Sequence, residues 1–167
     1  MTDFEDALRS RLDSNERLAS ERARAEEEMD RAAERVAEQQ QREAEERRER
    51  QDQRHAELAA RLDDLVATIR DQAPDIDVRA GWSRSGEEYL AKFTTTQKRP
   101  RRSLTIELDR DDDEVLARWH STVGDSLELW HLLEFDTEML EALVLQVVDD
   151  GYWTSAKRPP AFPGATY

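Results

Sequence analysis

The sequence predicts an α+β protein, in which a long N-terminal α-helix (a coiled-coil rod) precedes a small five-stranded antiparallel meander sheet covered by one C-terminal helix. Two observations predict this class. The 5 glycines and 5 prolines all follow residue 73, and residues 1–73 contain one aromatic side chain, Phe4. From Pro74 onward, the apolar spacing changes from a helical repeat to the two-residue alternation of strands. We expect a helix over 1–73, a sheet-plus-helix domain over 74–150 and an aromatic, proline-rich tail over 151–167.

The N-terminal segment consists mainly of the strong helix formers Ala, Glu, Arg, Gln and Leu. Thr2 and Glu5 fit a capping box at its start, and Pro74 predicts its end at Ala73. About 70 residues at ~1.5 Å each give a rod on the order of 100 Å. Such a rod must pair with a second copy, pair with a different helical protein or stand alone in solvent. We favour self-association, with a homodimer as the expected oligomer.

Two apolar seams on this helix carry the prediction of self-association. The first is a weak heptad pattern with Leu8 at position a, and the second, in another phase, surrounds Leu58 and Leu62. Asn15 at an a position either fixes the register of a dimer or is an ordinary surface residue. The change of phase requires a stutter in a straight two-stranded coil. The predicted oligomer interface comprises Leu8, Leu18, Met29, Val36, Leu58, Leu62, Leu65 and Ile69.

The polar stretch between the seams, residues 38–54, contains one apolar side chain, Ala44. Opposite charges four residues apart, such as Glu43 and Arg47, stabilise a helix by ~0.2–0.5 kcal/mol per pair. This stretch can therefore remain helical without a partner.

Five segments after Pro74 alternate apolar and polar residues, and they are centred on 76–82, 89–93, 104–108, 115–119 and 127–135. Their short, turn-rich connections predict an antiparallel meander. A helix over 136–150 should cover the apolar face, with Asp136 as its N-cap, a hydrophobic staple between Phe135 and Leu140, and Gly151 as its stop. The tail is expected to pack across the sheet or onto a partner rather than remain a flexible peptide. Its aromatic residues are Tyr152, Trp153, Phe162 and Tyr167.

In the last strand, Leu129, His131 and Leu133 share the predicted buried face. His131 is then a hydrogen-bonded core residue, and His120 a surface residue, rather than two members of a metal site. Trp130 and Leu132 would lie on the uncovered face, where they form a partner-binding patch unless the tail aromatics cover them. The predicted partner-binding residues are Trp130, Leu132 and Trp153.

Two charged clusters have a functional and a structural interpretation. The basic residues of 98–102 could contact phosphates from a hairpin tip, but a solvated turn or a salt bridge to another subunit's acidic rod is favoured. The acidic residues of 109–114 resemble the opening of a calcium loop, yet the glycine is missing and position twelve is His120, so we predict a charged turn. The weak candidates for nucleic-acid binding are Lys98, Arg99, Arg101 and Arg102.

Composition limits the possible functions. The 167 residues include 39 Asp and Glu against 25 Lys and Arg, giving a net charge of −14, which argues against a broad cationic surface for nucleic acid or anionic membranes. The chain has no cysteine, so thiol catalysis and disulfides are excluded.

We find no signal peptide and no apolar run that could span a membrane, and we expect a cytoplasmic protein. The excess of acids and of Arg over Lys suits a GC-rich genome or, as we favour, a halophile.

No glycine-rich phosphate loop, nucleophile elbow or zinc-protease motif is present, so we expect neither an enzyme nor a bound cofactor or metal. The predicted function is that of a structural or adaptor component of a larger assembly. Such a protein would oligomerise through its rod and dock another protein with its C-terminal domain. The alternative is a nucleic-acid-associated regulator, dimerised by the coiled coil, with phosphate contacts from hairpin 98–102. Mimicry of nucleic acid by the acidic rod is disfavoured because arginines interrupt its negative charge.

Overall fold

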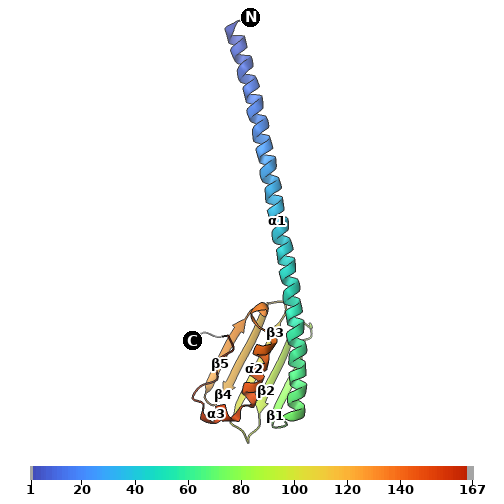
Figure 1. Ribbon diagram of the computed structural model, residues 1–167, viewed down its shortest axis with the longest axis vertical. Helices are drawn as coiled ribbons and strands as arrows, with labels where there is room; N and C mark the ends of the chain where they lie inside the picture. The colour runs from blue at the N-terminus through green and yellow to red at the C-terminus, as the bar shows by residue number, and fades with distance from the viewer. Residues whose placement is uncertain (1, 165–167) are drawn as a thin grey trace. The chain divides into compact units, whose positions relative to one another are not determined.

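The computed structural model describes residues 2–164 and confirms the predicted α+β class, with one long helix, an antiparallel sheet and a C-terminal helix (Figure 1). The chain divides into two compact units, Met1–Arg47 and Arg48–Tyr167. Met1 of the predicted helix and Tyr167 of the predicted tail lie outside the described residues. The elements are α1 (Asp3–Gln72), β1 (Ile76–Trp82), β2 (Glu88–Thr95), β3 (Arg102–Asp109), β4 (Glu114–Ser121), β5 (Gly124–Trp130), the 3-10 turn η1 (Leu132–Glu134), α2 (Thr137–Val148) and α3 (Asp150–Ser155).

The first unit contains the α1 residues up to Arg47. At its start the Thr2 hydroxyl accepts a hydrogen bond from the backbone N–H of Glu5 at 3.4 Å, which fits the predicted N-terminal cap. Acidic side chains in the first turn, Asp3, Glu5 and Asp6, complement the positive end of the helix dipole. None of the described side chains of this unit is buried. Its helix is therefore held by its own backbone hydrogen bonds and good helix formers rather than by tertiary packing.

The second unit is built on a five-stranded antiparallel sheet with the strand order β1-β2-β3-β4-β5, as the short connections predict. The register aligns large side chains across the sheet: Val78 pairs with Phe93, Phe93 with Leu104, and Leu104 with Trp119. These four residues lie on one face and are buried. The opposite face carries the alternate residues, which are mostly polar or charged, and we call it the open face.

Two helices, rather than the one predicted, cover the buried face. Helix α2 lies over the middle of the sheet, and residues 48–72 of α1 lie beside it over β1 and β2 (Figure 1). A five-stranded sheet is about 20–25 Å wide, whereas one helix covers about 10 Å, so a single helix would leave two strands bare. Leu58 and Leu62 are fully buried in this core, and Arg61 of α1 forms an ion pair with Glu141 of α2 at 2.8 Å.

The prediction that the second apolar seam of α1 forms an interface between copies is therefore wrong. Leu58 and Leu62 form the centre of the second unit, and Leu65 and Ile69 pack against the same core. This also explains why the chain divides after Arg47, and not at Pro74 as the composition suggested. The last 25 residues of α1, from Arg48 to Gln72, belong to the sheet unit.

Strand β5 was predicted in the wrong phase and with the wrong end. It ends at Trp130, which is buried, while Leu127 and Leu129 are about half exposed on the open face. In the predicted segment 127–135, leucines occupy one phase and Trp130 and Leu132 the other, so apolar character alone does not choose between the phases. The choice is made by pairing with β4, because Val115 lies opposite Trp130 and both point into the core.

Helix α2 begins as predicted, with the Asp136 carboxylate accepting the backbone N–H of Met139 at 2.9 Å. Its predicted stop at Gly151 is wrong, because α2 ends at Val148 and Gly151 lies inside α3. Asp149 separates the two helices and caps the second by accepting the Tyr152 N–H at 3.1 Å. The tail packs on its own chain as far as it is described. Trp153 and Phe162 are both buried.

Candidate functional site

Two surfaces of the described residues are candidates for function, one on each unit. No cluster of three or more His, Asp or Glu side chains in residues 2–164 is arranged to hold a metal ion. None of the described helices combines the length and the apolar character that a membrane crossing requires. The first candidate is the apolar seam of the first unit, and the second is a depression on the open face of the sheet.

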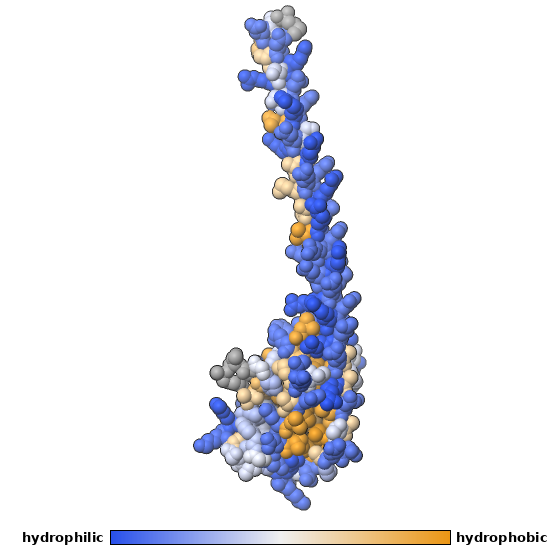
Figure 2. Space-filling view, viewed as in Figure 1, coloured by the Kyte–Doolittle hydropathy of each residue, from blue (hydrophilic) through white to orange (hydrophobic). Residues whose placement is uncertain are grey.

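The seam of the first unit consists of separate large apolar side chains on a hydrophilic helix, visible as isolated orange spots in Figure 2. Their exposed fractions run from 46% for Leu8 to 72% for Met29. Leu18 and Val36 lie between these values, so all four predicted members in this unit are at the surface. Phe4, also 72% exposed, occupies the d position that precedes Leu8 and extends the seam by one layer. Phe4 was not among the predicted interface residues, although the heptad pattern extended toward the N-terminus includes it.

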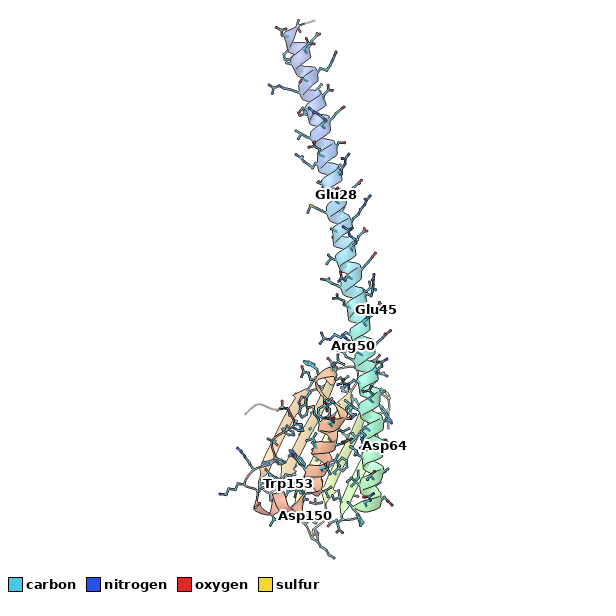
Figure 3. The ribbon with its side chains drawn as sticks, in the orientation of Figure 1. Glu28, Glu45, Arg50, Asp64, Asp150 and Trp153 are labelled. Atoms are coloured by element: carbon cyan, nitrogen blue, oxygen red, sulfur yellow. The ribbon has the colours of Figure 1, made fainter. Side chains whose placement is uncertain are left out.

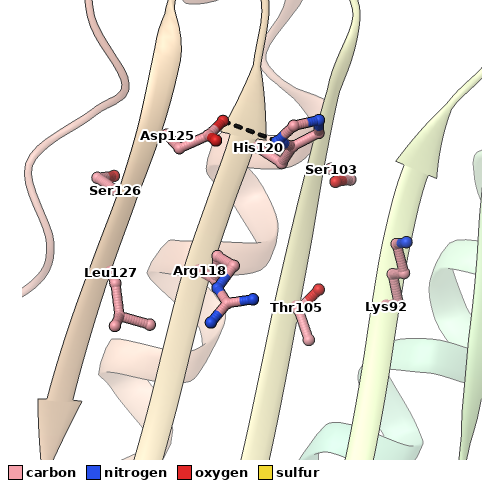
Figure 4. Close-up of a pocket in the computed structure, with 8 residues that line it drawn as sticks. All are labelled: Lys92, Ser103, Thr105, Arg118, His120, Asp125, Ser126 and Leu127. Carbon is pink, nitrogen blue, oxygen red and sulfur yellow. Dashed lines mark ion pairs between the residues drawn. The ribbon is translucent and has the colours of Figure 1, made fainter.

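The open face is organised in rows that the strand register sets. One row crosses the sheet as Arg79, Lys92, Thr105, Arg118 and Leu127. A neighbouring row contains Ser103, His120 and Asp125. Together they border a shallow depression of about 580 Å³ (Figure 4). The residues that line this open-face depression are Lys92, Ser103, Thr105, Arg118, His120, Asp125, Ser126 and Leu127.

The depression is locally cationic in a protein of net charge −14. His120 is paired with Asp125, with 2.7 Å between Nδ1 and Oδ1 (Figure 4). Lys92 and Arg118 are exposed, and neither forms an ion pair with a carboxylate of the described chain. Thr105 lies between them in the register and offers a hydroxyl. This arrangement can bind an anionic group with two cations and a hydroxyl donor.

An apolar row borders the depression. Leu90, Leu116 and Leu129 lie in register across the open face, with Glu107 between the first two. Leu90 and Leu129 are exposed. Burial beside its leucine neighbours raises the pKa of Glu107, and the negative charge of Glu88 raises it further. The open face thus presents unpaired cations and exposed leucines side by side.

The predicted nucleic-acid contacts at 98–102 are partly wrong, because two of the four basic residues serve the fold. Arg102 is buried, and its Nε donates to the backbone oxygen of Val147 at 2.9 Å. Arg99 donates from Nε to both carboxylate oxygens of Asp150, at 2.8 and 2.9 Å. These arginines satisfy the carbonyls at the end of α2, as cations at a helix C-terminus do. Lys98 and Arg101 remain exposed.

Asp150 holds the two arginines together at one end of the sheet unit, close to Trp153 (Figure 3). Burial would by itself raise the pKa of this carboxyl. Hydrogen bonds from Arg102 and Arg99, together with their positive charge, outweigh that effect and lower its pKa below the ordinary value. The Arg102 guanidinium also stacks over the Trp153 ring at 5.7 Å.

The predicted partner-binding patch of Trp130, Leu132 and Trp153 is wrong, because all three side chains are buried. The Trp130 ring lies 4.8 Å from Phe135 and 5.8 Å from Phe162, and Trp153 packs on Trp119 at 5.1 Å. The shifted phase of β5 turns Trp130 into the core, and the tail completes the core around it. The apolar residues that β5 does expose are Leu127 and Leu129.

The histidines also differ from prediction. His131 is exposed at the sheet edge, with Nδ1 3.3 Å from Oδ2 of Asp113, whereas His120 is on the surface as expected. The buried histidine is His55 of α1, whose Nε2 lies 3.1 Å from the backbone oxygen of Leu108. Among the acidic residues of 109–114, Asp109 accepts the backbone N–H groups of Asp111 and Asp112 at 3.1 Å. This is the charged turn that the sequence predicts.

Comparison of the chain with models of known protein families, with curated proteins and with solved structures finds no match.

Proposed function

We propose that the protein is a non-enzymatic adaptor, which self-associates through the seam of its first unit and binds an acidic partner protein with the open face of its second unit. One observation carries the proposal. The helix of the first unit buries none of its described side chains, yet five of its six exposed large apolar residues lie at a and d positions of one heptad pattern, and the sixth, Leu12, lies at the adjacent e position.

The seam favours pairing because its apolar surface gains about 25 cal/mol for each Å² removed from water. Phe4, Leu8, Leu18, Met29 and Val36 all fall on it, whereas the outer f positions hold only polar residues such as Ser20 and Gln41. A helix with one apolar line and a polar remainder is suited to a coiled coil. A second copy supplies the same seam by necessity, so self-association needs no further component.

Light scattering with size-exclusion chromatography tests self-association. The full chain should have a solution mass that is a multiple of 19.4 kDa. The double variant Leu18→Glu with Met29→Glu should reduce this mass to that of the monomer at the same concentration. The matched control, Ser20→Glu with Gln41→Glu, adds the same charge at outer positions and should leave the oligomer intact. A wild-type monomer at high micromolar concentration contradicts the proposal.

The open face supports binding of a protein segment that carries both carboxylates and apolar side chains. Lys92 and Arg118 supply unpaired positive charge, and Leu90, Leu127 and Leu129 supply adjacent exposed apolar surface. Among the described residues, the open face carries no Phe, Tyr or Trp on which nucleic-acid bases could stack. For that reason we favour a protein partner over the alternative of a nucleic-acid-associated regulator.

Fluorescence anisotropy with defined probes tests this surface. A labelled peptide that alternates Glu with Leu should bind the full chain, and Lys92→Glu with Arg118→Glu should abolish its binding. The control, Arg84→Glu with Lys157→Glu, changes the charge equally at exposed positions away from the depression and should retain binding. If labelled single-stranded DNA binds and the peptide does not, the partner protein is the wrong class and the regulator is favoured.

A further inference from the structure

The charge pattern beside the seam points to one geometry for self-association. We propose that two copies pair antiparallel over residues 18–43, with Met29 of each copy against Ala32 of the other. This inference rests on the proposed self-association and specifies its direction and register, which the seam alone leaves open.

The heptad g positions, which flank the seam, carry charges that change sign along the helix. They are Glu21 and Glu28 in the first half of the segment, then Arg35 and Arg42 in the second half. Residues at g face g of the other helix in an antiparallel pair, so Glu28 meets Arg35 and Glu21 meets Arg42. Each contact occurs twice by symmetry, giving four interchain ion pairs.

A parallel pair has the opposite electrostatics. There, each g residue faces the e residue five positions later on the other helix. Glu21 then meets Glu26, while Glu28 meets Ala33 and Arg35 meets Gln40. Like charges are brought together and no opposite charges are paired, so the flanking residues oppose the parallel arrangement.

The flanking charges are also free to make these contacts. Glu21, Glu28, Arg35 and Arg42 are exposed, and among the described residues none of them forms an ion pair within its own chain. The side chains of this unit extend away from the helix axis, as Glu28 does in Figure 3. An interchain pair therefore does not have to break an intrachain one.

The sizes of the residues that meet in the seam also favour the proposed register. In the proposed register, each a residue faces a d residue, so Met29 packs against Ala32 and Val36 against Ala25. Large residues then meet small ones in the four layers at the centre of the segment, which lets the helices approach closely, whereas Leu18 at its end faces Glu43. A parallel, in-register pair instead places Arg22 against its own copy, whereas the proposed register places it against Gln39.

One competing antiparallel register lies a heptad away. It places Leu18 against Val36 and Met29 against Ala25, which is an acceptable seam. However, it also places Glu28 against Glu28 and Glu26 against Glu26 at its centre. The proposed register places Glu26 against Ala33 instead, so its flanking contacts contain no like-charge pair. The competing register buries Leu18 better, because the proposed register places Leu18 against Glu43, and it also pairs Glu21 with Arg35. It nevertheless has two interchain ion pairs instead of four and adds two like-charge contacts, so the charges favour the proposed register.

Disulfide trapping tests direction and register in the full chain, which contains no native cysteine. Ala25→Cys and Val36→Cys proteins, one carrying a size tag, are mixed, allowed to exchange and oxidised. The proposed register predicts the mixed disulfide, because these positions face each other. Like positions should not link, since Ala25 lies about 16 Å along the axis from its own copy. Homodisulfides at position 25 would indicate parallel chains and overturn the inference.

The same experiment with Ala25→Cys and Met29→Cys detects the competing register, which alone places these positions opposite each other. A dominant disulfide between them would overturn the proposed register. Ser20→Cys at an outer position is the control for random collision and should remain reduced. A protein that is monomeric before any substitution overturns the self-association itself, whereas a dimer with the wrong disulfides overturns only its geometry.

A charge exchange provides a second test that does not depend on cysteine chemistry. Glu28→Arg should raise the dimer dissociation constant about tenfold, because two attractive contacts become repulsive. Adding Arg35→Glu in the same chain should restore the affinity, since the exchanged pair is again opposite in sign. Glu27→Arg at the adjacent outer position should have little effect. Failure of the double variant to recover, with helix content unchanged by circular dichroism, contradicts the antiparallel register.

Discussion

Arg102 shows how one buried charge can serve the fold. Its guanidinium lies out of solvent, where a charge without hydrogen bonds would be costly. The backbone oxygens of Pro100 and Val147 accept from it at 2.7 and 2.9 Å, and the Asp150 carboxylate pairs with it at 2.6 Å. The planar fork of arginine allows all these contacts at once, which lysine could not provide. Two arginines of the basic run, Arg99 and Arg102, therefore bind the carbonyl groups at the C-terminal end of α2 instead of facing solvent.

Replacing Arg102 with Met should lower the free energy of unfolding by about 2–4 kcal/mol, because carbonyl oxygens and one carboxylate lose their donor. Urea denaturation followed by tryptophan fluorescence measures the change. Arg101→Met, one residue earlier but exposed, should change stability by less than about 0.5 kcal/mol. Equal effects of the two substitutions would show that the hydrogen bonds of buried Arg102 contribute no more to stability than exposed Arg101 does.

The carboxyl of Asp150 should make stability depend on acid pH. Its pKa in the folded protein is lowered. Its contribution to the free energy of unfolding is therefore fully present above its ordinary pKa of 3.8, and it is lost as the pH falls through the pKa of the folded state. Asp150→Asn removes this dependence. The difference in unfolding midpoint between wild type and Asp150→Asn should therefore narrow below about pH 4. A constant difference down to pH 2 would contradict the lowered pKa.

Glu107 should show the opposite sign. Burial between Leu90 and Leu116 raises its pKa. The free energy of unfolding therefore decreases as the pH rises through the pKa of the folded state, because the carboxylate becomes charged in a partly buried position. Glu107→Gln should therefore stabilise the protein at pH 7, by at most about 1 kcal/mol because the side chain is still partly solvated. The thermal midpoint at pH 7 measures this effect, and a fall in the midpoint contradicts it.

At the scale of elements, local signals explain most of what could be predicted. The absence of glycine and proline before Pro74 predicts the long helix, and Asp136 predicts the start of α2. The strands follow from alternation and short turns, which are also local. The phase of β5 is different, because Leu127 and Leu129 occupy one face and Trp130 the other, and only the register with β4 places Trp130 inward. Periodicity within one segment contains no information about that register.

The two seams of α1 illustrate the same limit for the candidate site. Both have helical spacing, and sequence alone assigns both to an interface between copies. Leu58 and Leu62 instead lie against a sheet formed by residues later in the chain. The distinction depends on the width of that sheet, which leaves room for a second covering helix. The open-face depression was missed for a related reason, because Lys92 and Arg118 become neighbours in a row only through the strand register.

The two parts of α1 should respond differently to the same substitution. Leu62→Ala should destabilise the second unit by about 2–5 kcal/mol, because it leaves a cavity in a closed core. Leu18→Ala, on the exposed part of the same helix, should leave the unfolding of the sheet unit unchanged. Chemical denaturation monitored by tryptophan fluorescence reports this unit, since every tryptophan lies after Pro74. Similar losses of stability from both substitutions would contradict the assignment of Leu62 to the core of the sheet unit and of Leu18 to an exposed surface.

At the scale of the whole molecule, the proposed self-association would bring together two chains of net charge −14 each. Repulsion between the two chains opposes pairing, so burial of the apolar seam and the opposite charges at its flanking g positions must together outweigh this repulsion. In the antiparallel register, the chains leave the paired segment at opposite ends. The sheet units are then attached to opposite ends of that segment, rather than to the same end.

Salt should separate the two contributions to pairing. The repulsion caused by Glu28→Arg acts between exposed groups, and the screening length falls from about 10 Å at 0.1 M salt to about 3 Å at 1 M. The difference in dimer dissociation constant between this variant and wild type should therefore shrink at 1 M NaCl in sedimentation equilibrium. The Leu18→Glu and Met29→Glu variant should remain monomeric at both concentrations, because it replaces apolar surface in the seam. If 1 M NaCl leaves the Glu28→Arg difference unchanged, the loss is not electrostatic, and Glu28 does not face Arg35 of the second copy.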